Sequence, residues 1–105
     1  MAWWLFLDDE RFPVSDGWLI ARSFESARDL VLEKGLPEFI SFDHDLGRES
    51  KTGSDFAQWL IDHMLDNGLR FPLKFSYQIH SQNPVGSVNI NGKMEGAIKH
   101  IGWEG

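Results

Sequence analysis

The sequence contains no cysteine. This absence excludes a disulfide framework, a thiolate zinc site and a cysteine nucleophile. Long hydrophobic runs are missing too: the apolar start, Trp3 to Leu7, is far shorter than the roughly 20 residues of a membrane span and runs straight into the acidic pair Asp8-Asp9. That start does not resemble a signal peptide either. We therefore expect a cytoplasmic protein that does not enter a membrane.

Clustered basic side chains are a second absence. The chain has 10 lysines and arginines against 16 acidic residues, which gives a formal net charge of −6. Attraction to a nucleic-acid backbone comes from clusters of lysine and arginine, so we expect no long nucleic-acid tract as a ligand. A short or terminal phosphate can still bind where a metal ion, or the N–H groups at a helix start, offset the acidic charge.

The order of apolar segments predicts one α/β domain over residues 1–105. No internal repeat, low-complexity tract or linker divides the chain. Short apolar runs predict strands at 3–7, 18–21, 39–42 and 73–79. Helical spacing predicts helices after the N-cap Ser23, after Asp55, and at Pro84 behind the N-cap Asn83; the last is expected to be weak because it contains three glycines. This alternation predicts a three-layer fold with a parallel sheet of about four strands and flanking helices.

Polar residues follow three of the predicted strands. The carboxyl ends of parallel strands share one edge, and open α/β sheets bind their ligands there. We therefore expect the polar residues to lie together. They are Asp8 and Asp9 after the first strand, Asp43, His44 and Asp45 after the third, and His80, Ser81 and Asn83 after the fourth.

Each of these segments also has a purely structural explanation. The acid pair fits a cation site or a solvated strand end, because neighbouring carboxylates ionise easily only near a cation or water. The Asp-His-Asp segment offers ligands for Mg²⁺ or Mn²⁺, or forms a turn. The segment 80–86 can aim helix N–H groups at a phosphate, or only cap a helix. The convergence of three strand ends favours a functional site over these structural explanations. The other two histidines, His63 and His100, are expected to pack against neighbouring residues or to lie on the surface.

Three stretches, together with Thr52-Gly53, resemble the cyclic-phosphate-processing receiver-like domains of bacteria and phages. They are Leu5 to Pro13, Ser41 to Gly47 and His80 to Gly86, and the resemblance covers nearly the whole chain in order. It implies a reduced response-regulator receiver fold with a flavodoxin-like sheet, and a site built from the three polar segments. It also implies a role in handling cyclic phosphate ends, as in RNA repair, in the cytoplasm of a bacterium or a phage-infected host.

The chain departs from ordinary receivers in one respect. Receivers hold Mg²⁺ with an acid pair, accept a phosphoryl group on an aspartate after the third strand, and contact it with a lysine after a fifth strand. Here Lys93 and Lys99 lie in the glycine-bearing tail, with no predicted strand before them. His44 and His80 instead favour acid–base catalysis on a phosphoester, because histidine exchanges protons near neutral pH.

We therefore predict a phosphoesterase that opens a cyclic phosphate, at a 2′,3′-cyclic RNA end or in a cyclic nucleotide. One histidine is expected to activate water and the other to protonate the leaving oxygen. A divalent metal, Mg²⁺ or Mn²⁺, is the expected cofactor. The expected roles are catalytic for His44, His80 and Asp43, substrate-binding for Ser81, Asn83 and Arg11, and metal-binding for Asp8, Asp9 and Asp45.

The expected partner is a small phosphorylated ligand or an RNA terminus, and the sequence predicts no oligomeric state. Two alternatives stay open. One is a receiver-like signalling module without enzymatic activity, whose acids only hold Mg²⁺. The other is a module that binds a cyclic nucleotide without turning it over.

Overall fold

Four strands form one parallel sheet, in the order β2-β1-β3-β4. The fold is taken from a computed structural model that describes residues 2–47 and 51–104. Along the chain the elements are β1 (Trp4–Leu7), β2 (Trp18–Ala21), α1 (Phe24–Lys34), β3 (Phe39–Phe42), α2 (Gly53–Asp66), β4 (Ser76–Ile79) and α3 (Pro84–Ile101). The predicted α/β class, with a receiver-like parallel sheet of four strands, is confirmed. Of the stretch predicted as the fourth strand, only its last four residues are β4.

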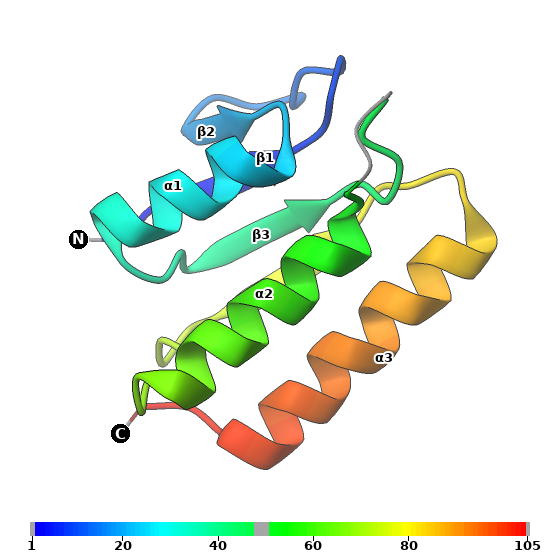
Figure 1. Ribbon diagram of the computed structural model, residues 1–105. Coiled ribbons are helices and arrows are strands. Elements are labelled where there is room, and N and C mark those ends of the chain that lie inside the picture. The colour runs from blue at the N-terminus through cyan, green and yellow to red at the C-terminus, as the bar shows by residue number, and fades with distance from the viewer. Residues whose placement is uncertain (1, 48–50, 105) are drawn as a thin grey trace.

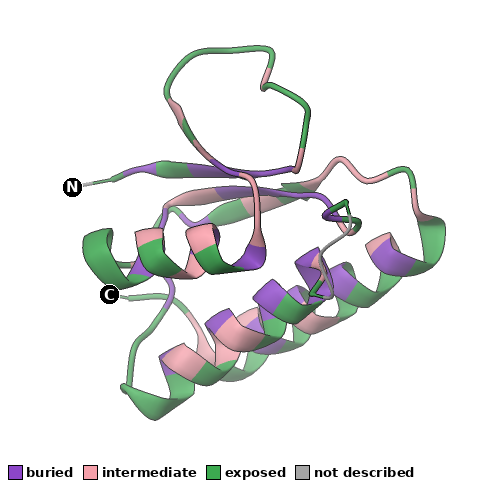
Figure 2. Ribbon diagram, turned by 45° about the horizontal axis from the view of Figure 1, so that its top comes forward, coloured by how far each residue is buried: buried purple, intermediate pink, exposed green. Residues whose placement is uncertain are grey.

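The three helices lie on one face of the sheet (Figures 1 and 2). Their placement follows from the strand order: β2 lies on one side of β1, whereas β3 and β4 lie on the other. Right-handed crossovers in opposite directions pass over opposite faces. The helical connections α1 and α2 therefore cover one face, and the helix-free connection 8–17 arches over the other (Figure 2). The expected third layer is thus not helical, and we correct the three-layer prediction to two layers plus a loop.

The helices begin at the capping residues that their sequences supply. Ser23 accepts from the backbone N–H of Ser26, and Asn83 accepts from Gly86 ahead of Pro84 at the helix start. Helix α2 begins with a reciprocal capping box between Thr52 and Asp55. The predicted caps Ser23 and Asn83 are confirmed.

Helix α3 is stronger than its three glycines suggest. It runs for 18 residues, because Ile90, Met94 and Ala97 are buried along one side. Packing of an apolar face outweighs intrinsic helix propensity in most proteins. The residues that the sequence placed in a weak tail, Lys93 and Lys99, are therefore part of a regular helix, where Lys93 Nζ donates to the carbonyl of Ser54 in α2.

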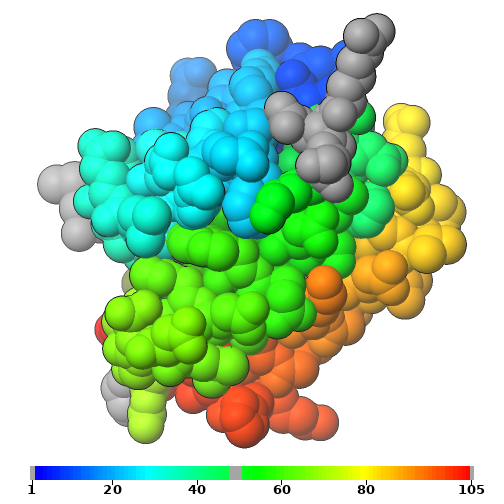
Figure 3. Space-filling view, in the orientation of Figure 1, coloured from blue at the N-terminus to red at the C-terminus, as the bar shows by residue number. Residues whose placement is uncertain are grey.

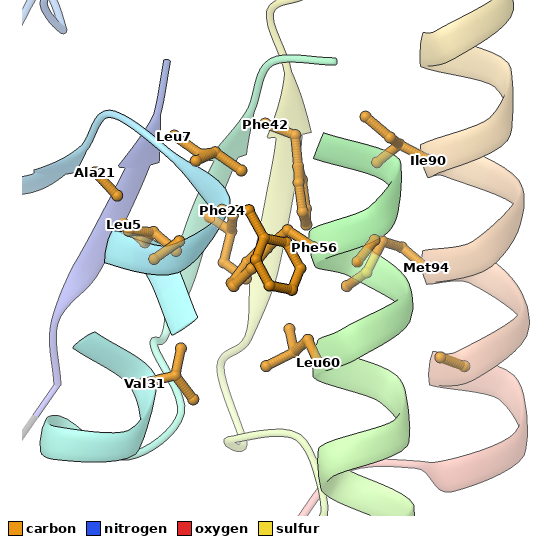
Figure 4. Close-up of a cluster of buried hydrophobic side chains, with 14 of the residues drawn as sticks. Leu5, Leu7, Ala21, Phe24, Val31, Phe42, Phe56, Leu60, Ile90 and Met94 are labelled. Carbon is orange, nitrogen blue, oxygen red and sulfur yellow. The ribbon is translucent and has the colours of Figure 1, made fainter. Parts of the chain in front are cut away.

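The core lies between the sheet and the helices. Leu5 and Leu7 point into it from β1, and Phe56 of α2 lies at its centre, between residues of α1 and of α3 (Figure 4). On their outer side the helices pack next to one another and cover most of the sheet in this view (Figure 3). Among the described residues, no helix is both long enough and apolar enough to span a lipid bilayer.

Candidate functional site

The carboxyl ends of β1, β3 and β4 meet at one edge of the sheet. The strand ladder continues one residue beyond each strand: the N–H of Asp43 donates to the carbonyl of Leu7 (3.0 Å), and that of His80 to the carbonyl of Phe42 (2.9 Å). This register brings the first residue after each strand to the same level. Asp8, Asp43 and His80 are those residues, as the sequence predicts.

Asp8 is completely buried, and both of its carboxylate oxygens have hydrogen-bond partners. Its Oδ1 accepts the backbone N–H groups of Glu10 and Arg11, each at 2.9 Å. Its Oδ2 lies 2.9 Å from Arg11 Nε and 2.9 Å from His80 Nε2. Burial alone would raise the pKa of Asp8, but these hydrogen bonds and the charge of Arg11 outweigh it and hold that pKa below its ordinary value. Asp8 is therefore an ionised anchor for the loop that follows β1.

The ring of His80 is held at both nitrogens and on one face. Nδ1 lies 2.7 Å from Ser41 Oγ, Nε2 faces Asp8, and the ring stacks on Phe6 with 4.6 Å between centroids. The Ser41 oxygen already accepts from Gln78 Nε2 (3.1 Å), so its hydroxyl proton is free to point to Nδ1. We assign the His80 proton to Nε2 on this ground, where Asp8 accepts it.

Asp43 is buried beside Asp8 and shares its arginine. Arg11 Nη2 lies 3.5 Å from Asp43 Oδ2. Burial, and then the negative charge of Asp8, raise the pKa of Asp43 above its ordinary value. The pKa values of the two neighbouring carboxyl groups are thus pushed in opposite directions, a pattern typical of acid–base sites. We call Asp8, Arg11, Ser41, Asp43 and His80 the inner cluster.

The inner cluster contains a group that can hold a metal ion. One ligand atom each of Asp8, Asp43 and His80 lies within 4.8 Å of the others. Two carboxylates alone suit Mg²⁺, and an added imidazole nitrogen favours Mn²⁺ or another transition metal. The Arg11 guanidinium lies beside both carboxylates, where it offsets part of their charge.

A second group of site residues lies nearer to solvent. His44 Nδ1 lies 3.0 Å from Asp45 Oδ1, and the Asp45 side chain is 67% exposed. The hydrogen bond to His44 lowers the pKa of Asp45. Asn83 Nδ2 lies 3.5 Å from both His44 Nδ1 and the Asp45 carboxylate. We call His44, Asp45 and Asn83 the outer cluster. Among the described residues, hydrogen bonds to the His44 ring involve Nδ1, which leaves Nε2 for a ligand.

The remaining predicted site residues lie around these two clusters. Asp9 and Asp45 line an open pocket of about 350 Å³ together with Arg11 and Asp43. They share this pocket with Asp43 but are not part of the close group formed by Asp8, Asp43 and His80. Ser81 Oγ accepts the backbone N–H of Asn83 (3.1 Å) and so shapes the turn before α3.

Two glycines allow the backbone to come close to the site. A Cβ on Gly53 would lie 1.8 Å from the carbonyl oxygen of Asp43, and a Cβ on Gly86 would lie 2.2 Å from Cγ of His44. The N–H of Gly53 also donates to the carbonyl of His44 (2.8 Å). The starts of α2 and α3 thus press directly against the Asp43-His44 segment.

The fold and this edge of the sheet agree with the comparison to known protein families. The family model for the cyclic-phosphate processing receiver domain matches residues 3–96. The chain belongs to this family. The match includes every residue of the inner and outer clusters of this receiver domain. No curated protein and no solved structure matches the chain significantly.

Sequence reasoning missed four residues that support the site of this receiver domain. Ser41 and Gln78, which pair in register across β3 and β4, hold His80, and Phe6 stacks on it. Arg22 donates to the backbone carbonyls of Asp8 and Arg11, at 3.2 and 2.6 Å. A signal was present for Ser41 and Gln78. Each lies two residues before a site residue, so strand alternation places it on the same face as that residue.

Proposed function

We propose that this receiver domain is a metal-dependent phosphoesterase that opens a cyclic phosphate, at a 2′,3′-cyclic RNA end or in a cyclic nucleotide. The observation that carries the proposal is the meeting of Asp8, Asp43 and His80 beside Arg11, at the edge where α/β sheets bind ligands. Membership of the cyclic-phosphate processing receiver domain family supports the class of substrate.

The charge of the inner cluster supports a divalent cation. Asp8 and Asp43 against Arg11 leave a net negative charge when both acids are ionised, and a cyclic phosphodiester is itself an anion. A further positive charge is therefore needed before the phosphate can bind. The carboxylates of Asp8 and Asp43 are a suitable ligand pair for such an ion, with His80 beside them. A divalent metal bound there would supply Lewis-acid stabilisation of the phosphate charge. Arg11 then contributes its guanidinium to the phosphate oxygens.

His44 is the proposed base. Asp45 accepts from Nδ1–H, so the lone pair lies on Nε2, and a carboxylate in this position holds an imidazole in the tautomer that removes a proton. His44 takes a proton from water, the water oxygen bonds to phosphorus, and one ring P–O bond breaks. The leaving oxygen takes a proton, for which we propose the doubly protonated ring of His80 as the source, so that His80 ends the step neutral and the product is a phosphomonoester. His44 then returns its extra proton to solvent.

The start of α3 offers a second group of phosphate contacts. Asn83 Oδ1 accepts the backbone N–H of Gly86 at 2.9 Å, while the amide nitrogen of Asn83 faces the carboxylate of Asp45. Helix N-termini attract anions. We propose that Asn83 and Ser81 contact a phosphate oxygen on this side, and that Asp9 and Asp45 line the approach to it.

Phosphorus NMR of ring opening tests the proposal. The substrates are adenosine 2′,3′-cyclic phosphate and adenosine 3′,5′-cyclic phosphate, each with Mg²⁺, with Mn²⁺ and with EDTA. We expect turnover that depends on the metal, and a loss of about 100-fold or more in His44→Ala, His80→Ala and Asp43→Asn. The control is His100→Ala, which changes an exposed histidine of α3. Unchanged turnover in His44→Ala and His80→Ala would contradict the proposal.

The same variants separate two roles of His80. As the proton donor, His80 is needed for turnover but not for metal binding. As a metal ligand, it is needed for both. We therefore expect His80→Ala to retain stabilisation by Mn²⁺ while it loses turnover, and a loss of both would assign His80 to the metal.

A second candidate function rests on the position of Asp43. It follows β3 and lies against Asp8, the arrangement in which a receiver accepts a phosphoryl group. Incubation with acetyl phosphate, followed by mass measurement of the intact protein, tests this function. Stable acyl phosphate on Asp43 or Asp45, without hydrolysis of any cyclic phosphate, would favour a signalling module.

A further inference from the structure

The helix-free face of the sheet carries a row of aromatic side chains. Trp4 is paired in register with Trp18 on β2 and with Phe39 on β3, so three neighbouring strands place an aromatic ring at the same level. The ring centroids lie 5.0 to 5.7 Å apart. One step nearer the site, Phe6 lies against both Trp18 and His80. This row leads directly to the inner cluster.

The loop 8–17 arches over this face (Figure 2). Side chains of the loop and of the sheet line a pocket there. Its volume is about 460 Å³, within the usual range for small-molecule sites. The sheet supplies the floor and the loop supplies a wall. The lining consists of Trp4, Phe6, Arg11, Phe12, Pro13, Val14, Ser15, Trp18, Phe39, Gln78 and His80. We call it the aromatic pocket.

The wall of the aromatic pocket is held at both ends although its tip is exposed. At one end Arg22 bonds to the carbonyls of Asp8 and Arg11, and at the other Trp18 Nε1 donates to Ser15 Oγ (3.2 Å). Between them the apolar side chain of Phe12 is 74% exposed. Phe12 lines the pocket, and the Arg22 guanidinium lies 4.6 Å from the centroid of its ring. An exposed aromatic ring on an anchored loop is suited to contacting a flat ligand.

Two residues join the aromatic pocket to the phosphate site. Arg11 lines both the aromatic pocket and the acidic pocket of Asp9 and Asp43, and His80 belongs to the aromatic pocket and to the inner cluster. Gln78 donates one N–H to Ser41, which leaves its amide oxygen as an acceptor in a largely apolar lining. The aromatic pocket therefore combines stacking surfaces, a hydrogen-bonding amide and an adjacent cation.

We propose that the aromatic pocket binds the base of a nucleotide whose phosphate lies at Arg11 and His80. Bases stack on aromatic side chains, and such stacking depends little on which base is present. The inference rests on the proposed function for the position of the phosphate and adds the recognition of the base. The substrate class is thus a nucleoside cyclic phosphate rather than a cyclic phosphate of a sugar or a polyol.

Calorimetric titration with two ligands tests the inference. The protein is His44→Ala, which keeps the aromatic pocket intact and does not consume the ligand. Adenosine 2′,3′-cyclic phosphate has a base, and glycerol 1,2-cyclic phosphate has none. Since stacking on one aromatic ring is worth about 10-fold in affinity, we expect the base-bearing ligand to bind at least about 10-fold more tightly. Equal affinities would overturn the inference.

Variants locate the base on the helix-free face. Trp4→Leu and Phe12→Ala, both at exposed or partly exposed positions, should remove most of the difference between the two ligands. Trp59→Leu and Val88→Ala are the matched controls, because they remove a tryptophan and an exposed apolar residue of the helical layer. In the two control variants, the difference in affinity between the two ligands should be the same as without them. An unchanged difference in Trp4→Leu and Phe12→Ala would overturn the inference.

The outcomes separate this inference from the proposed function. Base-dependent binding without any ring opening would support base binding in the aromatic pocket and contradict the proposed phosphoesterase activity. Ring opening at the same rate with and without a base would support the phosphoesterase and overturn the base site. If sedimentation shows a dimer that Trp4→Leu dissociates, and adenosine 2′,3′-cyclic phosphate binds no better than the glycerol ligand, the face is a contact between copies of the chain and the inference is wrong.

Discussion

The inner and outer clusters each pair an aspartate with a histidine, but in different surroundings. In the inner cluster Asp8 is fully buried, both nitrogens of His80 are bonded, and Arg11 offsets two carboxylates. In the outer cluster Asp45 is mostly exposed and holds His44 by a single hydrogen bond. A buried polar group must find partners inside the protein, whereas an exposed one uses water. Within residues 2–47 and 51–104, no buried side-chain nitrogen or oxygen lacks a hydrogen-bond partner.

Because of this difference, we expect the two clusters to contribute differently to the stability of the fold and to catalysis. Changes in the inner cluster should alter folding and activity together, because its bonds also tie β1, β3 and β4 to the loop after β1. A change of Asp45 in the outer cluster should alter activity alone, whereas a change of Asn83 would also remove the N-cap of α3. Five changes test this contrast, from the largest expected effect on stability to the smallest.

Gly53→Ala should break both clusters at once. Its Cβ would collide with the backbone carbonyl of Asp43, which joins the two clusters and cannot move like a side chain. We expect a loss of about 3 kcal/mol in the free energy of unfolding, measured by urea denaturation. Gly92→Ala is the matched control, because nothing lies within 4 Å of its added Cβ and it is in the middle of α3. It should gain about 0.5–1 kcal/mol. Equal behaviour of the two variants would contradict the close approach.

Asp8→Asn should cost about 3 kcal/mol at neutral pH, because it leaves Arg11 and His80 without the buried carboxylate that pairs them. The loss should depend on pH. Since the pKa of Asp8 is lowered on folding, its ionised form stabilises the protein above the ordinary value of 3.8, and this contribution disappears as the pH falls through the lowered pKa. The difference in unfolding free energy between wild type and Asp8→Asn should therefore shrink below about pH 4. A constant difference between pH 6 and pH 3 would refute this account.

Mn²⁺ should stabilise the wild-type protein against heat. A ligand at about 100 times its Kd adds about 2.7 kcal/mol to the free energy of unfolding, and EDTA should reverse the shift in Tm. Asp43→Asn should remove most of the effect, whereas Asp62→Asn, an acidic residue of α2 outside both clusters, should retain it. An equal shift in both variants would place the metal elsewhere.

Asp43→Asn should lose activity and gain stability. Burial and Asp8 raise the pKa of Asp43, so its ionised form is less favourable in the folded than in the unfolded protein, and the cost is present above its raised pKa. Asparagine resembles the neutral acid and avoids this cost. We expect a gain of up to about 1 kcal/mol at pH 7 in urea denaturation, with turnover reduced about 100-fold. A variant that loses both would show that Asp43 is needed for folding.

Asp45→Asn should have the smallest effect on stability. An exposed ion pair of this kind contributes within about 0.5 kcal/mol, so the urea midpoint should stay near that of wild type. Turnover should still fall, by about 10-fold, because His44 loses the carboxylate that orients it. A large loss of stability would show that Asp45, like Asp8, is needed for folding, and would contradict the expected contrast between the clusters.

Local sequence signals predicted most of the fold. Four apolar runs of the expected order form the four strands, and the caps Ser23 and Asn83 begin the helices where they were expected. The layering was wrong, because the face that a crossover covers depends on strand order, and the sequence does not state that order. Helix α3 was underestimated for a related reason: its stability comes from Ile90, Met94 and Ala97 packing on distant elements.

The candidate site, too, was predicted from the sequence only in part. Strand ends marked by Asp8, Asp43 and His80 are visible in the sequence, since parallel strands bring their carboxyl ends together. The partners that hold them, Ser41 and Arg22, were not predicted. Strand alternation places Ser41 on the face of Asp43, but its hydrogen bond to His80 and that of Arg22 to Asp8 depend on side-chain positions in the folded chain. Nothing in residue spacing alone separates an inner from an outer cluster.

By itself the sequence determined which chemistry is available at the edge of the sheet: carboxylates, imidazoles and a helix start, and no thiol. The tertiary structure decided how these groups differ. It buried Asp43 next to Asp8, which raised the pKa of Asp43, and it gave Asp8 the hydrogen bonds that lower its pKa, whereas it left Asp45 in water. It also left one face of the sheet without helices, beside the same edge, where Trp4 and Trp18 form a pocket. Burial and proximity are properties of the folded chain, because only folding excludes water and joins residues that are distant in sequence.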